Sequence, residues 1–137
     1  MCGGGVVWQF CRYLNDKLFQ DNYHNHFLDL VSLSLISDMM DMREFETAYL
    51  IREGLKEENI VNPFVSGMSE RNAFSIGPEP TPIAWAFYIT PFLNSAMRSG
   101  TIEEKKLIFN AMLEYKAYQR IPSTKRGCKG QEESLLE

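Results

Sequence analysis

Two aspartates beside an apolar stretch are the residues of this chain best suited to metal chemistry. Asp38 and Asp41 follow the mainly apolar run of residues 27–36. A carboxylate at the end of a buried element is a common ligand for a divalent cation. An isolated acid that ends a helix or strand at the surface explains the same spacing and is the more frequent case. The spacing makes Asp38 a candidate metal ligand without deciding between these two interpretations.

A second pair of side chains suits phosphate. Asn94 and Arg98 lie in residues 91–100, which we expect to form a turn-like segment between a strand and a helix. An arginine can donate two parallel hydrogen bonds to a phosphate, and an asparagine can hold the segment or a substrate oxygen. A lone arginine is usually a surface charge. The expected loop position favours the functional interpretation, because binding residues are concentrated on loops.

Three other groups each have a plain structural alternative. His24 and His26 stand in a polar segment and could bind a transition metal, although an ordinary loop is the better explanation. Residues 3–5 are three glycines before an expected helix, where backbone N–H groups could receive a phosphate or the backbone could pack closely on a neighbour. The basic residues between positions 125 and 129 could touch a phosphate backbone, but a solvated loop is favoured.

Hydrophobic spacing predicts the elements that position these residues. A period of three to four residues predicts helices over residues 6–19 and 44–58. For residues 27–36 a helix is favoured weakly over a strand. Alternating apolar residues predict a strand over 83–89, and the Thr101–Glu104 capping box predicts a helix to about residue 118. Residues 59–82 are rich in proline and glycine and are expected to be a linker, with one short helical turn near Val65.

Composition limits the class of protein. The 137 residues are 45% hydrophobic, which is enough for a core, and the net charge of -4 provides no general attraction for nucleic acid. Three cysteines (Cys2, Cys11 and Cys128) form no disulfide or zinc pattern. No signal peptide or membrane span is evident, so the expected location is the cytoplasm. The expected fold class is α/β and helix-rich.

Three segments, taken in order, resemble the RecJ branch of the DHH phosphoesterases, the single-stranded-DNA-specific exonucleases. Residues 2–7 (CGGGVV) resemble the family's glycine-rich helix start, and residues 28–40 (LDLVSLSLISDMM) resemble its last catalytic-domain motif. Residues 91–98 (PFLNSAMR) resemble a family loop of the form Pro-x-x-Asn-Ala-Ala-Gly-Arg. The resemblance covers residues 1–114, and its strength is in the order and spacing of the three segments.

The resemblance implies roles for three residues. Asp38 would be the catalytic-site ligand of a divalent metal, Mn²⁺ or Mg²⁺ in this family. Arg98 and Asn94 would lie close to the phosphates of a bound single strand of DNA. Met97 and Ser95 stand where the family has glycine and alanine, which weakens the assignment of Asn94 more than that of Arg98.

The family's other metal ligands come from motifs that lie upstream, and this chain has none of them. The resemblance therefore implies a fragment that is inactive alone, because one aspartate cannot hold Mg²⁺ or Mn²⁺ for hydrolysis. Its partners would be the remaining parts of the parent chain and, through them, single-stranded DNA. The implied divisions are the end of a DHH-type metal-binding domain (1–42), a connecting helix (43–58), a linker (59–82), a second-lobe segment (83–120) and a mobile tail (121–137).

Two alternatives remain open. The chain could be a non-catalytic interaction module that docks on a partner through Phe92, Trp85 and helix faces. It could also belong to another DHH phosphoesterase that acts on small nucleotides. The exonuclease interpretation differs from the interaction module in that it predicts exposed apolar surface where the rest of the protein packs.

Overall fold

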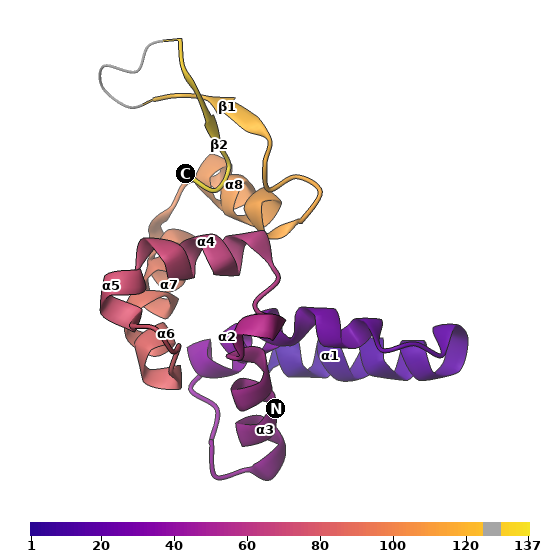
Figure 1. Cartoon of the computed structure of the whole chain (residues 1–137). Helices are drawn as coiled ribbons and strands as arrows, with labels where there is room; N and C mark the ends of the chain where they lie inside the picture. Colours follow the sequence, from indigo (N-terminus) through magenta and orange to yellow (C-terminus); the bar gives the residue numbers. More distant parts are fainter. Residues whose placement is uncertain (125–129) are drawn as a thin grey trace.

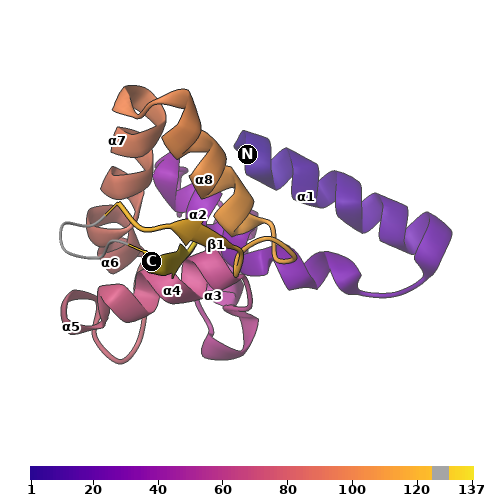
Figure 2. The same cartoon turned by 90° about the horizontal axis from the view of Figure 1, so that it is seen from above.

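The fold consists mainly of short helices, most of them about three turns or fewer. A computed structural model of the chain describes residues 1–124 and 130–137. The elements run in the order α1 (Gly3–Leu14), η1 (Asn15–Phe19), η2 (Tyr23–Phe27), α2 (Leu28–Ser37), α3 (Phe45–Gly54), η3 (Glu57–Asn59), α4 (Pro63–Arg71), α5 (Ala73–Ile76), α6 (Pro82–Tyr88), α7 (Thr90–Ser99), α8 (Ile102–Met112), β1 (Arg120–Pro122) and β2 (Glu132–Ser134). Figure 1 shows α1 running away from the other helices as an arm, and Figure 2 shows the same arm from above.

Helix α2 is the central element, in contact with α1, α3, α6 and α7. Residues 28–37 form this helix and most of them are buried, so the weak preference for a helix over residues 27–36 is confirmed. Two glycines let neighbouring helices approach it closely. A Cβ on Gly4 of α1 would overlap the side chain of Ser34, and a Cβ on Gly54 of α3 would overlap that of Ser32. The hydroxyl of Ser32 also donates to the carbonyl of Leu50, 2.8 Å away.

The predicted helices over 6–19, 44–58 and 101–118 are present; the first begins earlier, at Gly3, and the other two α-helices are shorter than predicted. The first continues from α1 into the π-helical turn η1, and the second is α3 followed by the single turn η3. The third is α8, whose capping box forms as expected: Thr101 Oγ1 accepts from the N–H of Glu104, and the Glu104 carboxylate accepts from the N–H of Thr101.

Two sequence predictions about secondary structure are wrong: the strand over residues 83–89 and the turn-like segment over residues 91–100, most of which belongs to the helix α7. Residues 83–89 form the helix α6 rather than a strand, because Thr81 caps its N-terminus and Pro82 occupies its first turn. The fully buried Trp85 and Ile89 lie one helical turn apart. The short helical turn expected near Val65, within the proposed linker of residues 59–82, is the helix α4, and α5 follows it. Helix α4 begins with the same signal: Asn62 caps it ahead of Pro63.

The C-terminal part forms a two-stranded antiparallel hairpin of β1 and β2, with Ile121 opposite Glu133. It is the only sheet in the described residues, so the helix-rich part of the predicted fold class is confirmed and its sheet component is reduced to this hairpin. Cys128 and the basic residues between 125 and 129 lie outside the described residues. Among the helices of 1–124 and 130–137, none has the length and apolarity needed to cross a bilayer.

Candidate functional site

Asp38 stands at the C-terminal end of α2, where the helix closes in a Schellman motif. The N–H of Met39 donates to the carbonyl of Ile36, and the N–H of Met40 donates to that of Leu35, both at 3.0 Å. Met39 adopts a left-handed conformation (φ 49°), which usually favours glycine. The turn presents Asp38 to solvent, and its carboxylate has no hydrogen bond or ion pair with any residue that the structure describes. It is an exposed carboxylate without a described partner at a fixed helix end.

Asp41, the second candidate acid, already has a partner. Its two oxygens accept from Nε and Nη2 of Arg43, with Nη2 2.7 Å from Oδ2. These hydrogen bonds lower the pKa of the Asp41 carboxyl. Both side chains are exposed, so this is a local surface pair rather than part of a metal site.

Asn94 and Arg98 lie on helix α7 rather than on the turn expected from sequence. A spacing of four residues puts them on one side of that helix. Arg98 is exposed and Asn94 half-buried. Helix α7 contacts α2, so the candidate phosphate ligands and the candidate metal ligand come from neighbouring helices. Each of the two exposed side chains, Asp38 and Arg98, remains available to a ligand.

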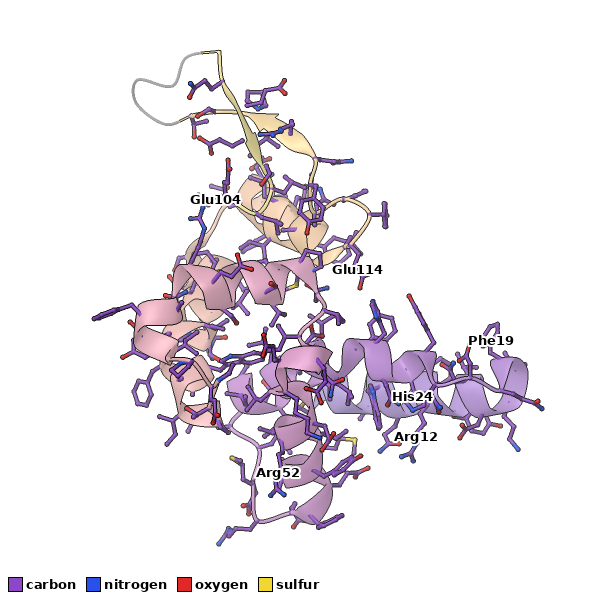
Figure 3. The ribbon with its side chains drawn as sticks, in the orientation of Figure 1. Arg12, Phe19, His24, Arg52, Glu104 and Glu114 are labelled. Atoms are coloured by element: carbon purple, nitrogen blue, oxygen red, sulfur yellow. The ribbon has the colours of Figure 1, made fainter. Side chains whose placement is uncertain are left out.

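The two histidines make structural contacts. His24 is buried with its ring edge-on to Trp8, and the Trp8 indole donates to the His24 carbonyl at 2.9 Å. His26 stacks on Tyr23, and its Nε2 lies 2.5 Å from a carboxylate oxygen of Glu114. Figure 3 shows Glu114 on the side of the molecule that faces the α1 arm. The loop interpretation of these histidines therefore agrees with the geometry.

No metal cluster is complete within residues 1–124 and 130–137, because no three His, Cys, Asp or Glu side chains gather there. The glycines at positions 3–5 belong to the first turn of α1. Gly4 meets Ser34, whose hydroxyl is 3.3 Å from Cys2 Sγ, so close packing accounts for this glycine.

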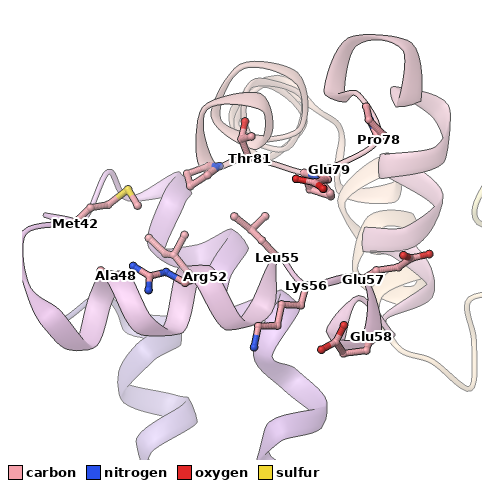
Figure 4. A pocket seen from close by; sticks show the side chains of 13 residues that line it. Met42, Ala48, Arg52, Leu55, Lys56, Glu57, Glu58, Pro78, Glu79 and Thr81 are labelled. Atoms are coloured by element: carbon pink, nitrogen blue, oxygen red, sulfur yellow. The ribbon is translucent and has the colours of Figure 1, made fainter.

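A groove of about 530 Å³ lies between α3 and residues 78–82 (Figure 4). Arg52 and Lys56 line it together with Glu57, Glu58 and Glu79. With both signs of charge present, the groove has no clear preference for an anionic ligand. None of the candidate site residues lines it, so it is separate from the site considered above.

One ionisable residue that the sequence analysis did not single out is fully buried. Asp29, at the start of α2, accepts from the N–H groups of Leu30, Val61 and Asn62 at 2.7–3.0 Å. Burial raises the pKa of this carboxyl, and the three hydrogen bonds oppose that shift. Asn62 in turn donates from its side chain to the carbonyl of Met112. Asp29 is thus a structural link between α2, α4 and α8.

Comparison with known proteins gives two relatives. They are "Putative SPbeta prophage-derived single-strand DNA-specific exonuclease YorK" of Bacillus subtilis (strain 168) and "Putative single-strand DNA-specific exonuclease yorK" of Bacillus phage SPbeta. Each is 35% identical over 127 residues, which is 93% of this chain and 21% of the relative. No family model matches the chain, and no solved structure matches it significantly.

The chain spans about a fifth of the length of the curated relatives it matches. The resemblance to single-strand DNA-specific exonucleases that the sequence indicated is confirmed at this level, whereas the DHH assignment remains a prediction. Over nearly all of its length, the chain is therefore similar to one segment of a protein named as a single-strand DNA-specific exonuclease.

Proposed function

We propose that this chain is a segment of a metal-dependent exonuclease that hydrolyses phosphodiester bonds of single-stranded DNA. The observation that carries the proposal is its 35% identity, over 93% of the chain, to relatives named for that activity. The net charge of -4 means that binding to DNA has to depend on a few local groups and on bound cations rather than on the overall field.

In this proposal, Arg98 and Asn94 bind the phosphates of the strand. Their four-residue spacing on α7 lets an arginine fork and an amide act on the same phosphate or on adjacent ones. Arg98 is exposed and has no ion pair with any described residue, so binding a phosphate breaks no existing contact. The helical setting replaces the loop expected from the sequence and holds the two side chains in a fixed relation.

Asp38 contributes one ligand to a bound Mn²⁺ or Mg²⁺ ion. Its exposed, unpartnered carboxylate suits a hard cation, which prefers oxygen ligands. The described residues provide no second or third ligand beside it, so the other ligands would come from the remaining parts of the parent protein. A bound divalent ion supplies the charge that makes phosphorus open to attack by water. It follows that the isolated chain is inactive.

A chimera tests this function: the B. subtilis relative with its matched segment replaced by this chain. We expect Mn²⁺-dependent cleavage of single-stranded DNA, reduced about a hundredfold or more by Asp38→Ala, since a lost ligand weakens the metal site. Asp41→Ala is the matched control, because that carboxylate is paired with Arg43. The isolated chain should not cleave. Equal activity of the two variants would remove Asp38 from the site.

The second candidate function is that of another DHH phosphoesterase, which acts on small nucleotides. The same chimera distinguishes this candidate from the exonuclease by its choice of substrate. Preference for a dinucleotide over a long single strand would support that candidate and count against the exonuclease. The non-catalytic interaction module is weakened by one observation: Trp85, expected to dock on a partner, is fully buried. Phe92 is half exposed and stays compatible with docking.

A further inference from the structure

Helix α1 has an apolar surface on both sides. Of its 12 residues, only Arg12 is charged. One side, with Trp8 and Gly5, is buried against the rest of the molecule. The opposite side is exposed, and four of its apolar side chains are between 57% and 62% accessible: Val6, Val7, Phe10 and Tyr13. A helix that is apolar nearly all round is normally buried in its complete protein.

A hollow beside this helix extends the exposed surface. It measures about 390 Å³ and has an almost wholly apolar lining. Val7 and Cys11 contribute to it from α1, Phe27 from the end of η2 and Leu30 from α2. We call this hollow, together with Val6, Val7, Phe10 and Tyr13, the α1 apolar face. It combines a projecting row of side chains with a recess, which is the shape that accepts an apolar helix or a sheet face.

We propose that the α1 apolar face is the docking surface for the portion of the exonuclease polypeptide that lies outside the segment matched here. This inference rests on the proposed function. The matched segment accounts for only 21% of the relatives, so a large amount of polypeptide is available to cover the face. Figures 1 and 2 show α1 projecting from the other helices, and the side chains of Val6, Val7, Phe10 and Tyr13 are exposed.

Docking of another part of the same polypeptide on the α1 apolar face is favoured over docking of a second copy of this chain. Within one polypeptide the effective concentration of the cover is about millimolar, whereas a second copy has to associate from its free concentration. The occupant we commit to is therefore an apolar surface of the same longer protein. A dimer formed through α1 is the competing outcome of the test.

Cys11 supplies a direct reporter, because its half-buried thiol lines the hollow. The labelling rate of Cys11 by a thiol reagent is measured by peptide mass spectrometry, in the isolated chain and in the chimera of the B. subtilis relative described above. We expect labelling to be slower in the chimera by about tenfold or more, since a docked cover has to open before the reagent can enter.

Two matched variants identify the face. Phe10→Lys places a charge on it and should restore fast labelling of Cys11 in the chimera, with a lower Tm. Phe74→Lys makes the same change at a fully exposed phenylalanine of α5. It should alter neither the labelling rate of Cys11 nor the Tm of the chimera. In the isolated chain both variants should fold like the parent, because both side chains are exposed.

Three results would overturn the proposal. The first is a chimera that labels as fast as the isolated chain, and the second is one that does not fold, since the cover is required to fit this face. The third is a concentration-dependent dimer of the isolated chain that protects Cys11 and is lost in Phe10→Lys. A folded chimera with a protected Cys11 but no nuclease activity would reject the proposed function and leave the docking face standing.

Discussion

Replacement of Asp29 by alanine should destabilise the chain more than any surface acid would. The carboxylate accepts three backbone hydrogen bonds, and Asn62, the donor at 2.7 Å, is only 2% exposed. Without the carboxylate, the Asn62 N–H has no acceptor and little access to water. The N–H of Val61 lies nearer the surface, where water can substitute.

The size of the effect follows from these contacts. Removing the carboxylate leaves the buried Asn62 N–H without an acceptor, which costs about 1–3 kcal/mol, and loses the hydrogen bonds from Val61 and Leu30, worth about 0.5–1.5 kcal/mol each. The burial that raises the pKa of the carboxyl opposes part of this loss, because the variant has no charged group to bury. We expect a net loss of about 2–3 kcal/mol, a large fraction of a typical folding free energy. In urea this lowers the unfolding midpoint by about 1–2 M.

The assay is urea unfolding followed by tryptophan fluorescence, since Trp8 and Trp85 are both buried. The control is Asp38→Ala, which removes an exposed carboxylate with no described partner and should cost less than about 0.5 kcal/mol. If Asp29→Ala and Asp38→Ala unfold at the same urea concentration, the carboxylate does not link the helices as described.

Three further predictions concern the backbone and pH. Burial raises the pKa of Asp29 in the folded state, so the contribution of this carboxyl to stability is full below its unfolded-state pKa and falls as the pH rises through its folded-state pKa. The difference in unfolding free energy between the parent and Asp29→Asn should therefore shrink over that pH range. Gly4→Ala, which meets a neighbouring side chain, should lose about 1–3 kcal/mol, whereas Gly3→Ala, with nothing within 4 Å, should gain about 0.5–1 kcal/mol by thermal unfolding. Met39→Gly should raise stability by about 1 kcal/mol, because glycine adopts the left-handed conformation without strain; an unchanged Tm would argue against that conformation.

The helices that sequence predicted well are those with a long periodic pattern or an explicit cap. The capping box of Thr101 and Glu104 is a local signal, and α8 starts where that signal places it. Residues 83–89 are harder, because seven residues fit a period of two as well as one of 3.6. The deciding information is Thr81 ahead of Pro82, a cap followed by a proline in the first turn, and the same pattern at Asn62 and Pro63 starts α4.

The candidate site could be predicted only in part, for a physical reason. Residue types and order single out Asp38, Asn94 and Arg98. Asp38 lies directly after α2, and Asn94 and Arg98 lie on α7, which contacts α2. Burial is a property of tertiary packing, so the enclosed position of Asp29 could not be read from neighbouring residues. Its carboxylate accepts hydrogen bonds from the N–H groups of Val61 and Asn62, which lie 32 and 33 positions away in the sequence.

The close approach of α1 and α3 to α2 has a consequence for mutational tolerance. Ser32 and Ser34 lie on different faces of α2, and each meets a glycine of a neighbouring helix. Large apolar residues in the core can often exchange with one another when volume is conserved. Gly4, Gly54, Ser32 and Ser34 have no residue of equal volume to replace them. In a library of all single substitutions, these four positions should therefore accept fewer amino acids than the leucines and isoleucines around them.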